Sequence, residues 1–209
     1  SDLRTKIDDF TRDTLATGDA KLQLALELPL DELDATRVRG AVAFAGNDVV
    51  LDRALPPFEG LVGRLEFTEG QLALRDLRAK FLGGEVQAQG DAPAPGRPRV
   101  DATGSIPAAS LAQWRDASFD AALPARLAQA LSGSLAFEAR FELRDRASSL
   151  AIDSDLTGVA STLPAPFAKQ ADERWPLRVE SVSAPSGAET LRMSLRDAAQ
   201  LVLERAGRA

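Results

Sequence analysis

Apolar side chains recur at every second position through much of this chain, and this alternation limits the folds that it can adopt. Leu22, Leu24 and Leu26 alternate with mostly polar neighbours, and a longer run of the same kind spans residues 135–143. Successive side chains of a β-strand point to opposite faces of a sheet, so each run has one apolar and one polar face. The pattern predicts a mainly β protein of roughly ten to thirteen short strands in a curved, largely antiparallel sheet.

Turn residues and changes of parity separate the other expected strands. These strands are expected around residues 38–44, 49–51, 61–68, 72–81, 86–90, 100–104, 150–152, 177–179, 191–195 and 200–204. Residues 46–48 predict a turn, and Gly83-Gly84 predicts a tight hairpin turn. Leu74 and Leu77 lie on opposite parities, which predicts a β-bulge near Asp76.

Two segments follow helical spacing instead. The first is expected to end at Gly18, and its apolar positions are Leu3, Ile7, Phe10 and Leu15. The second is Ala-rich, spans residues 107–131 and is expected to end at Gly133. This divides the chain into a helix with a first β meander (1–104), a helical connection (105–131) and a second β meander truncated at its end (132–209).

A sheet of this kind has to cover its apolar face. Two sheets can pack face to face, one sheet can close into a barrel, or a long curved sheet can leave its apolar face for a ligand as a groove or β-taco. An apolar strand face forms a protein core far more often than a binding surface. The few short helices expected here are too few to cover so large a sheet, so the three arrangements stay open.

Composition removes most catalytic chemistries from this chain. It has no Cys, no His and no Tyr, which excludes thiol nucleophiles, disulfides, His-based triads and zinc sites built from His or Cys. Its net charge of −6 argues against nucleic acid as a partner, because binding to phosphates needs a basic surface. We therefore expect no enzyme activity, no cofactor and no nucleic-acid binding.

Acidic residues are the remaining candidates for chemistry. The clusters are Asp8-Asp9, residues 31–34 and residues 153–155, and none has the ligand spacing of an EF-hand calcium site. A carboxylate pair for glycoside hydrolysis stays open among 31 acidic residues, but two Trp and no Tyr offer little surface for stacking sugars. No Ser-x-x-Lys motif and no Gly-x-x-x-x-Gly-Lys phosphate loop occurs. Solvated turns and helix ends explain these acids more simply.

Several short phrases occur in an order that resembles one protein family. They are Leu26-Glu27-Leu28-Pro29-Leu30, Val38-Arg39-Gly40, residues 60–70, Phe81-Leu82-Gly83-Gly84, Ser154-Asp155-Leu156-Thr157-Gly158, residues 163–169 and Trp175-Pro176-Leu177. The ordered set, from about residue 18 to residue 180, resembles the YhdP branch of the AsmA-like proteins of Gram-negative bacteria.

The resemblance implies a long periplasmic protein that is anchored in the inner membrane by an N-terminal helix and forms a bridge toward the outer membrane. Such proteins are expected to carry phospholipid along an elongated β groove, and the family offers no catalytic residue to transfer. The chain holds no apolar run long enough for the anchor helix. We therefore expect an interior fragment that meets the two membranes only through parts outside this sequence. The sequence assigns no particular oligomeric state to it.

The sequence hypothesis is a groove whose apolar strand positions shield acyl chains. The predicted lining consists of Leu22, Leu24, Leu26, Val42, Phe44, Leu65, Phe67, Leu135, Phe137, Phe141 and Ile152. The alternative is a structural β module with a closed core that mediates protein–protein contacts in the cell envelope. Lys169 and Trp175 are expected to have a local role in the fold, with contact to a lipid head group as the second possibility.

Overall fold

The computed structural model describes residues 15–18, 20–27, 37–51, 56–68, 71–92, 97–113, 129–144, 147–197 and 199–207. Its strands form one thirteen-stranded sheet, accompanied by a short 3-10 helix. The elements are β1 (Leu15–Thr17), β2 (Ala20–Glu27), β3 (Arg37–Val50), β4 (Phe58–Thr68), β5 (Leu72–Phe81), β6 (Gly84–Ala92), β7 (Arg99–Pro107), η2 (Ala108–Gln113), β8 (Leu131–Arg144), β9 (Ala147–Ser154), β10 (Val159–Ser161), β11 (Leu177–Ser183), β12 (Glu189–Leu195) and β13 (Ala199–Arg205). The predicted mainly β fold is confirmed.

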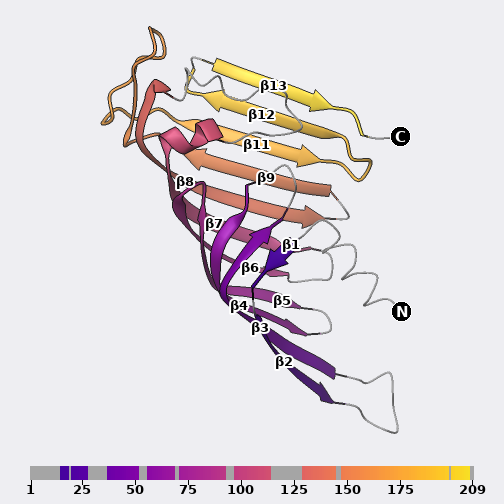
Figure 1. The fold of residues 1–209 in the computed structure, drawn as a ribbon. Coiled ribbons are helices and arrows are strands. Elements are labelled where there is room, and N and C mark those ends of the chain that lie inside the picture. The colour runs from indigo at the N-terminus through magenta and orange to yellow at the C-terminus, as the bar shows by residue number, and fades with distance from the viewer. Residues whose placement is uncertain are drawn as a thin grey trace.

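The strands follow one another across the sheet almost in chain order, from β2 at the bottom of Figure 1 to β13 at the top. Each strand from β3 to β8 pairs with the next, β9 pairs with β11, and the path continues through β12 to β13. β2 pairs with the first part of β3, β1 with its last part, and β10 with the start of β8. All pairings are antiparallel, and the described strands form an open sheet.

The bulge predicted near Asp76 is present in β5. Asp76 has a φ of 50°, and the pairing of β5 with β6 shifts between Leu74 and Leu77. The extra residue turns Leu77 to the side of the sheet that Leu74 faces, which is what the change of parity required.

The turn predicted at residues 46–48 does not form, because β3 continues through it. Gly46 has a φ of 100°, and the pairing with β4 shifts on either side of Asn47. The Asn47 side chain accepts a hydrogen bond from the Ala45 N–H (3.1 Å) and donates one to the Thr17 carbonyl (3.2 Å). These bonds replace the ladder bonds that a bulge disrupts, so the chain bends without leaving the sheet.

The two predicted helices are also corrected where the structure describes them. Leu15 lies in strand β1, while Leu3, Ile7 and Phe10 lie outside the described residues. In the second segment, residues 114–128 lie outside the described residues, the six-residue 3-10 helix η2 precedes them, and Gln129 after them is helical. Leu131 already begins β8, and Gly133 lies inside that strand with a φ of 89°, so the correction concerns the end of this helix. The residues at which the helix was expected to end are instead the first residues of β8, where they pair with β10 and β7.

The hairpin between β5 and β6 turns one residue earlier than predicted. Leu82 and Gly83 are its central residues, with φ angles of 51° and 75°, as a type I′ turn requires. Gly84 instead pairs with Phe81, and a Cβ at Gly84 would lie 2.0 Å from the Ser105 carbonyl oxygen. Gly84 therefore serves close strand packing rather than the turn.

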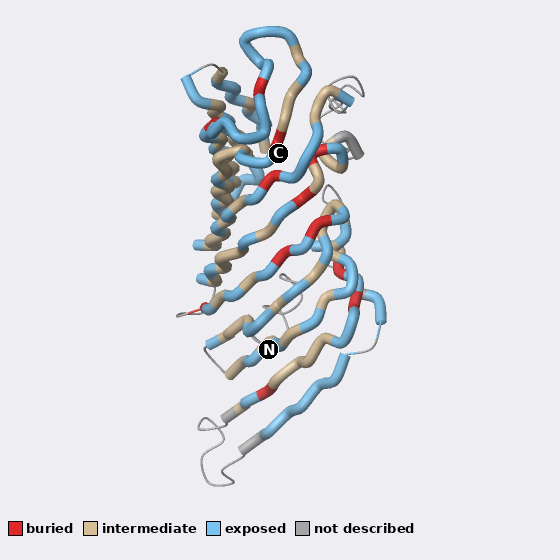
Figure 2. Tube along the Cα trace, turned by 90° about the vertical axis from the view of Figure 1, so that its left-hand side faces the viewer, coloured by how far each residue is buried: buried red, intermediate tan, exposed pale blue. Residues whose placement is uncertain are grey.

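The described part of the chain has only a small core. Buried residues are few and scattered along the trace (Figure 2). None of the large side chains that the structure describes is completely buried. Ile106, Ala108, Leu135 and Val159 form one buried cluster near the ends of β7 and β8. Most of the apolar surface of the sheet therefore lies outside a closed interior.

Candidate functional site

One face of the sheet can be followed from strand to strand through directly opposed residues. Leu22 of β2 lies opposite Val42 of β3, and Val42 lies opposite Leu65 of β4. Leu65 in turn pairs with Leu74 of β5. Directly opposed residues share a face, so these strands present their apolar positions on the same side.

The face continues without a break through the middle of the sheet. Beyond the bulge, Leu77 of β5 pairs with Ala88 of β6. Ala88, Ala102 and Ala139 then line up across β6, β7 and β8. The centre of the face therefore has a floor of small side chains.

The last strands complete the face. Ile152 of β9 lies opposite both Ala139 and Val179 of β11. Met193 of β12 lies opposite Val179 on one side and Leu201 of β13 on the other. We call the side that carries these residues the apolar face, and the opposite side the charged face.

The pairing registers assign all eleven predicted lining positions to the apolar face, and the side chain of one of them, Leu26, lies outside the described residues. Leu22 and Leu24 are 60% and 55% exposed, whereas Leu135 is only 7% exposed and belongs to the core cluster. The half-buried members are Val42, Phe44, Leu65, Phe67, Phe137, Phe141 and Ile152. The positions thus form one surface that is partly open to solvent, and their contact with lipid stays a prediction.

Sequence reasoning left part of this face out of the predicted lining. Met193 and Leu201 are 37% and 45% exposed on it, and Leu72, Leu74 and Leu77 are half-buried on it. Their alternation was visible in the sequence, but the partner strand that fixes the side they face was not. A register shift of one residue would have moved them to the other face.

Two phenylalanine rings on the apolar face lie across glycines of the neighbouring strand. A Cβ added at Gly40 would lie 2.2 Å from Cζ of Phe67, and one added at Gly104 would lie 2.8 Å from Cε1 of Phe137. Aromatic rings commonly cover glycines in this way in sheets. Both rings therefore lie along the sheet, so they project little from the apolar side.

One rim of the apolar face carries a wall, made of η2 and residues 155–176; we call it the rim wall. Leu156 and Val159 of this segment pack with Ile106 and Leu135, and Leu111 of η2 joins them. β10 ties the segment to the sheet by pairing with the first residues of β8. The rim wall therefore closes the face at the ends of β5 to β8.

Lys169 and Trp175 belong to the rim wall, and both are buried. The Lys169 Nζ donates hydrogen bonds to the carbonyls of Val159 (2.8 Å) and Gln170 (2.9 Å). The guanidinium carbon of Arg196 lies 4.8 Å from the centroid of the Trp175 ring. Their described contacts are local, which favours the predicted structural role over a contact with a head group.

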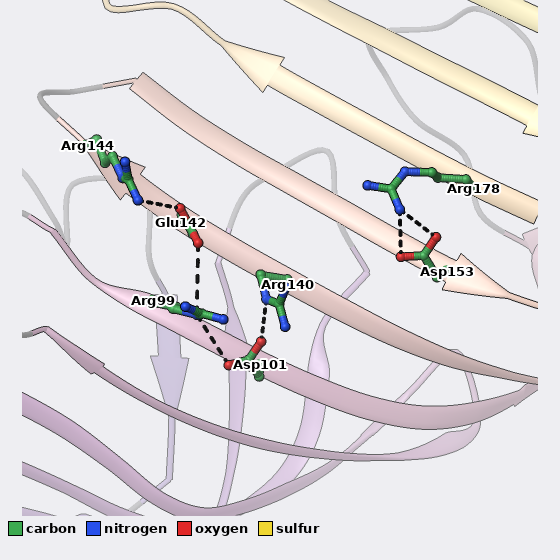
Figure 3. Close-up of polar contacts among 7 residues, drawn as sticks. All are labelled: Arg99, Asp101, Arg140, Glu142, Arg144, Asp153 and Arg178. Atoms are coloured by element: carbon green, nitrogen blue, oxygen red, sulfur yellow. Dashed lines mark hydrogen bonds and ion pairs between the residues drawn. The ribbon is translucent and has the colours of Figure 1, made fainter.

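Ion pairs between neighbouring strands cover the charged face (Figure 3). Arg140 of β8 donates to Asp101 of β7 at 2.8 Å, and Arg178 of β11 donates to Asp153 of β9 at 3.1 Å. The hydrogen bond from Arg140 lowers the pKa of the Asp101 carboxyl below its ordinary value. These side chains are about half exposed, so they keep this face hydrated and add little stability.

A hollow of about 780 Å³ opens between β2 and β6. Leu24, Gly40 and Phe67 of the apolar face line it together with Arg39 and Glu66 of the charged face. Because both faces contribute, the hollow is open surface at the rim rather than an enclosed ligand pocket.

The acidic clusters singled out in the sequence do not gather into a site where they are described. Asp155 accepts a hydrogen bond from the Thr157 N–H at 2.9 Å, which lowers the pKa of its carboxyl, and Arg174 donates to it as well. Asp8-Asp9 and residues 31–34 lie outside the described residues. Among the residues that are described, no three acidic groups approach closely enough to hold a metal ion.

An open antiparallel sheet with one continuous, partly exposed apolar face defines an open-faced β-sheet protein rather than a sandwich or a barrel. No described helix is long and apolar enough to cross a bilayer.

The chain belongs to the YhdP family, because the family model described as "YhdP protein" matches residues 1–208. The predicted resemblance is thereby confirmed. Comparison with curated proteins and with solved structures found no match. The family is associated with the cell envelope, and membership together with an open curved sheet fits a segment of a lipid-transport protein.

Proposed function

We propose that this chain is a segment of a bridge-like transporter whose apolar face shields phospholipid acyl chains between the inner and outer membranes. The full-length protein is then periplasmic and anchored in the inner membrane. The role of the segment is passive: it replaces water around the chains and needs no catalytic residue or cofactor. Membership of the YhdP family supports this proposal.

The observation that carries the proposal is exposed apolar surface on one continuous face. Leu22 and Leu24 at one end and Met193 and Leu201 at the other are each more than one-third exposed. Exposed apolar patches of this kind commonly mark binding sites. An acyl chain gains about 0.8 kcal/mol for each methylene removed from water, so a long chain binds such a face without specific contacts.

The length of the sheet also suits a lipid path. Its main path contains eleven strands. Ten spacings of about 4.8 Å give a face of roughly 48 Å. One leaflet of a bilayer is about 15 Å of hydrocarbon, half of a core of about 30 Å. The face is therefore longer than one acyl chain and suits lipids that lie on it in series.

Neighbouring residues of β13 offer a matched test. Leu201 lies on the apolar face and Val202 on the charged face, and they are 45% and 54% exposed. A benzophenone amino acid at position 201, but not at position 202, should crosslink to phospholipid when the protein is irradiated with membranes of its host. Leu24 and Gln23 form a second such pair on β2.

Equal lipid crosslinking on both faces, or none on either, would overturn the lipid path. A crosslink from position 201 to protein instead of lipid would favour the alternative of a structural module that mediates protein contacts in the envelope.

A further inference from the structure

Two charged side chains interrupt the apolar face, and they lie opposite each other. Among the described strand residues that the registers assign to this face, only Glu189 and Arg205 carry a formal charge. Arg205 Nη2 lies 2.6 Å from Glu189 Oε2, and Ser181 Oγ donates to Glu189 Oε1 at 2.9 Å. The pair is therefore a built polar group on an otherwise apolar surface.

The pair lies in a row of polar residues along one rim. Ser148 of β9, Ser183 of β11, Glu189 and Arg205 are successive partners across β9, β11, β12 and β13. β9 begins next to this row and ends at Ser154, beside the rim wall. The apolar residues of these strands thus form a lane with a polar border on the side away from the rim wall.

Stability does not explain why charges stand on this face. The Arg205 and Glu189 side chains are 51% and 26% exposed, and ion pairs of such exposure contribute little to folding. A guanidinium and a carboxylate side by side do match a ligand that carries both charges. Arginine binds phosphate through paired hydrogen bonds, and a carboxylate accepts hydrogen bonds from an ammonium group.

We propose that Glu189 and Arg205 bind the zwitterionic head group of a phosphoethanolamine lipid. This rests on the proposed function, because the acyl chains of that lipid would lie on the neighbouring lane of Leu191, Met193 and Leu201. Arg205 donates to the phosphate, and Glu189 accepts from the ammonium group. A head group with a net negative charge gains the first contact but is repelled by Glu189, so the site selects net-neutral lipids.

Binding from mixed vesicles tests this selection. The whole chain is incubated with vesicles that contain equal amounts of phosphatidylethanolamine, phosphatidylglycerol and diacylglycerol with the same acyl chains, re-isolated, and its bound lipids are counted by mass spectrometry. Phosphatidylethanolamine should exceed phosphatidylglycerol by about threefold, the size expected of one exposed charge contact. Glu189→Gln should remove this preference, and Arg205→Gln should lower both phospholipids but leave diacylglycerol unchanged.

The control is the ion pair Asp153–Arg178 on the charged face, also on neighbouring strands and with side chains that are 52% and 51% exposed. The double variant Asp153→Asn with Arg178→Gln should bind the three lipids as the unmodified chain does. If all lipids bind but the head-group ratio is one and Glu189→Gln leaves it there, the head-group site is wrong while the lipid path stands. If no lipid binds, the proposed function itself fails.

A second role for an inward-facing charge is to keep an edge strand from pairing with another sheet. In that case Arg205→Gln would raise self-association in sedimentation experiments without lowering the binding of either phospholipid relative to diacylglycerol, and this result would overturn the proposal.

Discussion

The rim wall and the outer strands of the sheet show two fates of the same sequence pattern. Ile106 and Leu135 are 6% and 7% exposed under η2 and residues 155–176, whereas Leu22 and Leu24 on β2 are more than half exposed. All four side chains stand on the apolar face of strands with similar alternation. The comparison teaches that alternation sets the side a residue faces, and that other segments of the chain decide whether this side becomes core.

Truncating one leucine in each region should give the largest contrast. Leu135→Ala should lower the free energy of unfolding by roughly 2–4 kcal/mol, because it leaves a cavity under the rim wall. Leu24→Ala should lower it by only about 0.5 kcal/mol, because solvent already reaches the side chain. Urea unfolding measures both values. Equal losses would mean that the outer strands are as closed as the rim wall.

Adding a methyl group beneath each phenylalanine ring should sharpen the comparison. Gly104→Ala should cost about 1–3 kcal/mol, because Phe137 is packed against the core cluster and cannot easily move. The new Cβ would also lie 2.8 Å from the backbone carbonyl oxygen of Glu85. Gly40→Ala should cost less, since Phe67 alone crowds that position and its ring can swing away from the face. The reverse order in thermal unfolding would contradict this difference between the regions.

Replacing the buried lysine should loosen the rim wall without disturbing the outer strands. Lys169→Met keeps the length of the side chain but leaves the carbonyls of Val159 and Gln170 without their donor, at a local cost of about 1–2 kcal/mol. Hydrogen exchange should quicken at the Ser161 N–H, which donates to the Lys169 carbonyl. The amides of β12 and β13 serve as the control, and faster exchange there as well would show that the sheet opens as one unit.

The smallest effect is expected on the charged face. Arg140→Gln removes the hydrogen bond that lowers the pKa of Asp101, so this pKa should rise toward its ordinary value in an NMR titration. A lowered folded pKa stabilises the protein above the unfolded pKa, and this contribution is lost as the pH falls through the folded value. The variant should therefore lose less stability on acidification. An unchanged Asp101 titration would show that Arg140 is not its main partner.

Sequence reasoning recovered the faces of the strands better than their ends. Leu22, Leu65 and Phe137 were assigned to one lining from local alternation, and the pairing registers bring all three to the same side. The bulge at Asp76 was also predictable, because only an extra residue reconciles the two parities in β5. Local signals suffice here because a strand has a side-chain period of two wherever it lies.

The failures occur where long-range contacts override a local signal. Gly46-Asn47-Asp48 resembles a turn, but hydrogen bonds of the Asn47 side chain to Ala45 and Thr17 hold β3 in the sheet. Leu131 fits a helical spacing, but pairing with Ser161 makes it the start of β8. Of the candidate site, sequence missed Glu189 and Arg205, although both share the parity of the apolar residues in their strands.

The sequence by itself determined that this chain forms antiparallel strands with one apolar and one polar side, and it determined the family. Period and composition act over a few residues, so they can be read without knowing what lies beside a strand. Only the tertiary structure decided which strands pair, that their apolar sides join into one face, and where the rim wall covers it. Those outcomes depend on contacts between residues distant in sequence, such as Ile106 with Val159, and a local pattern does not specify them.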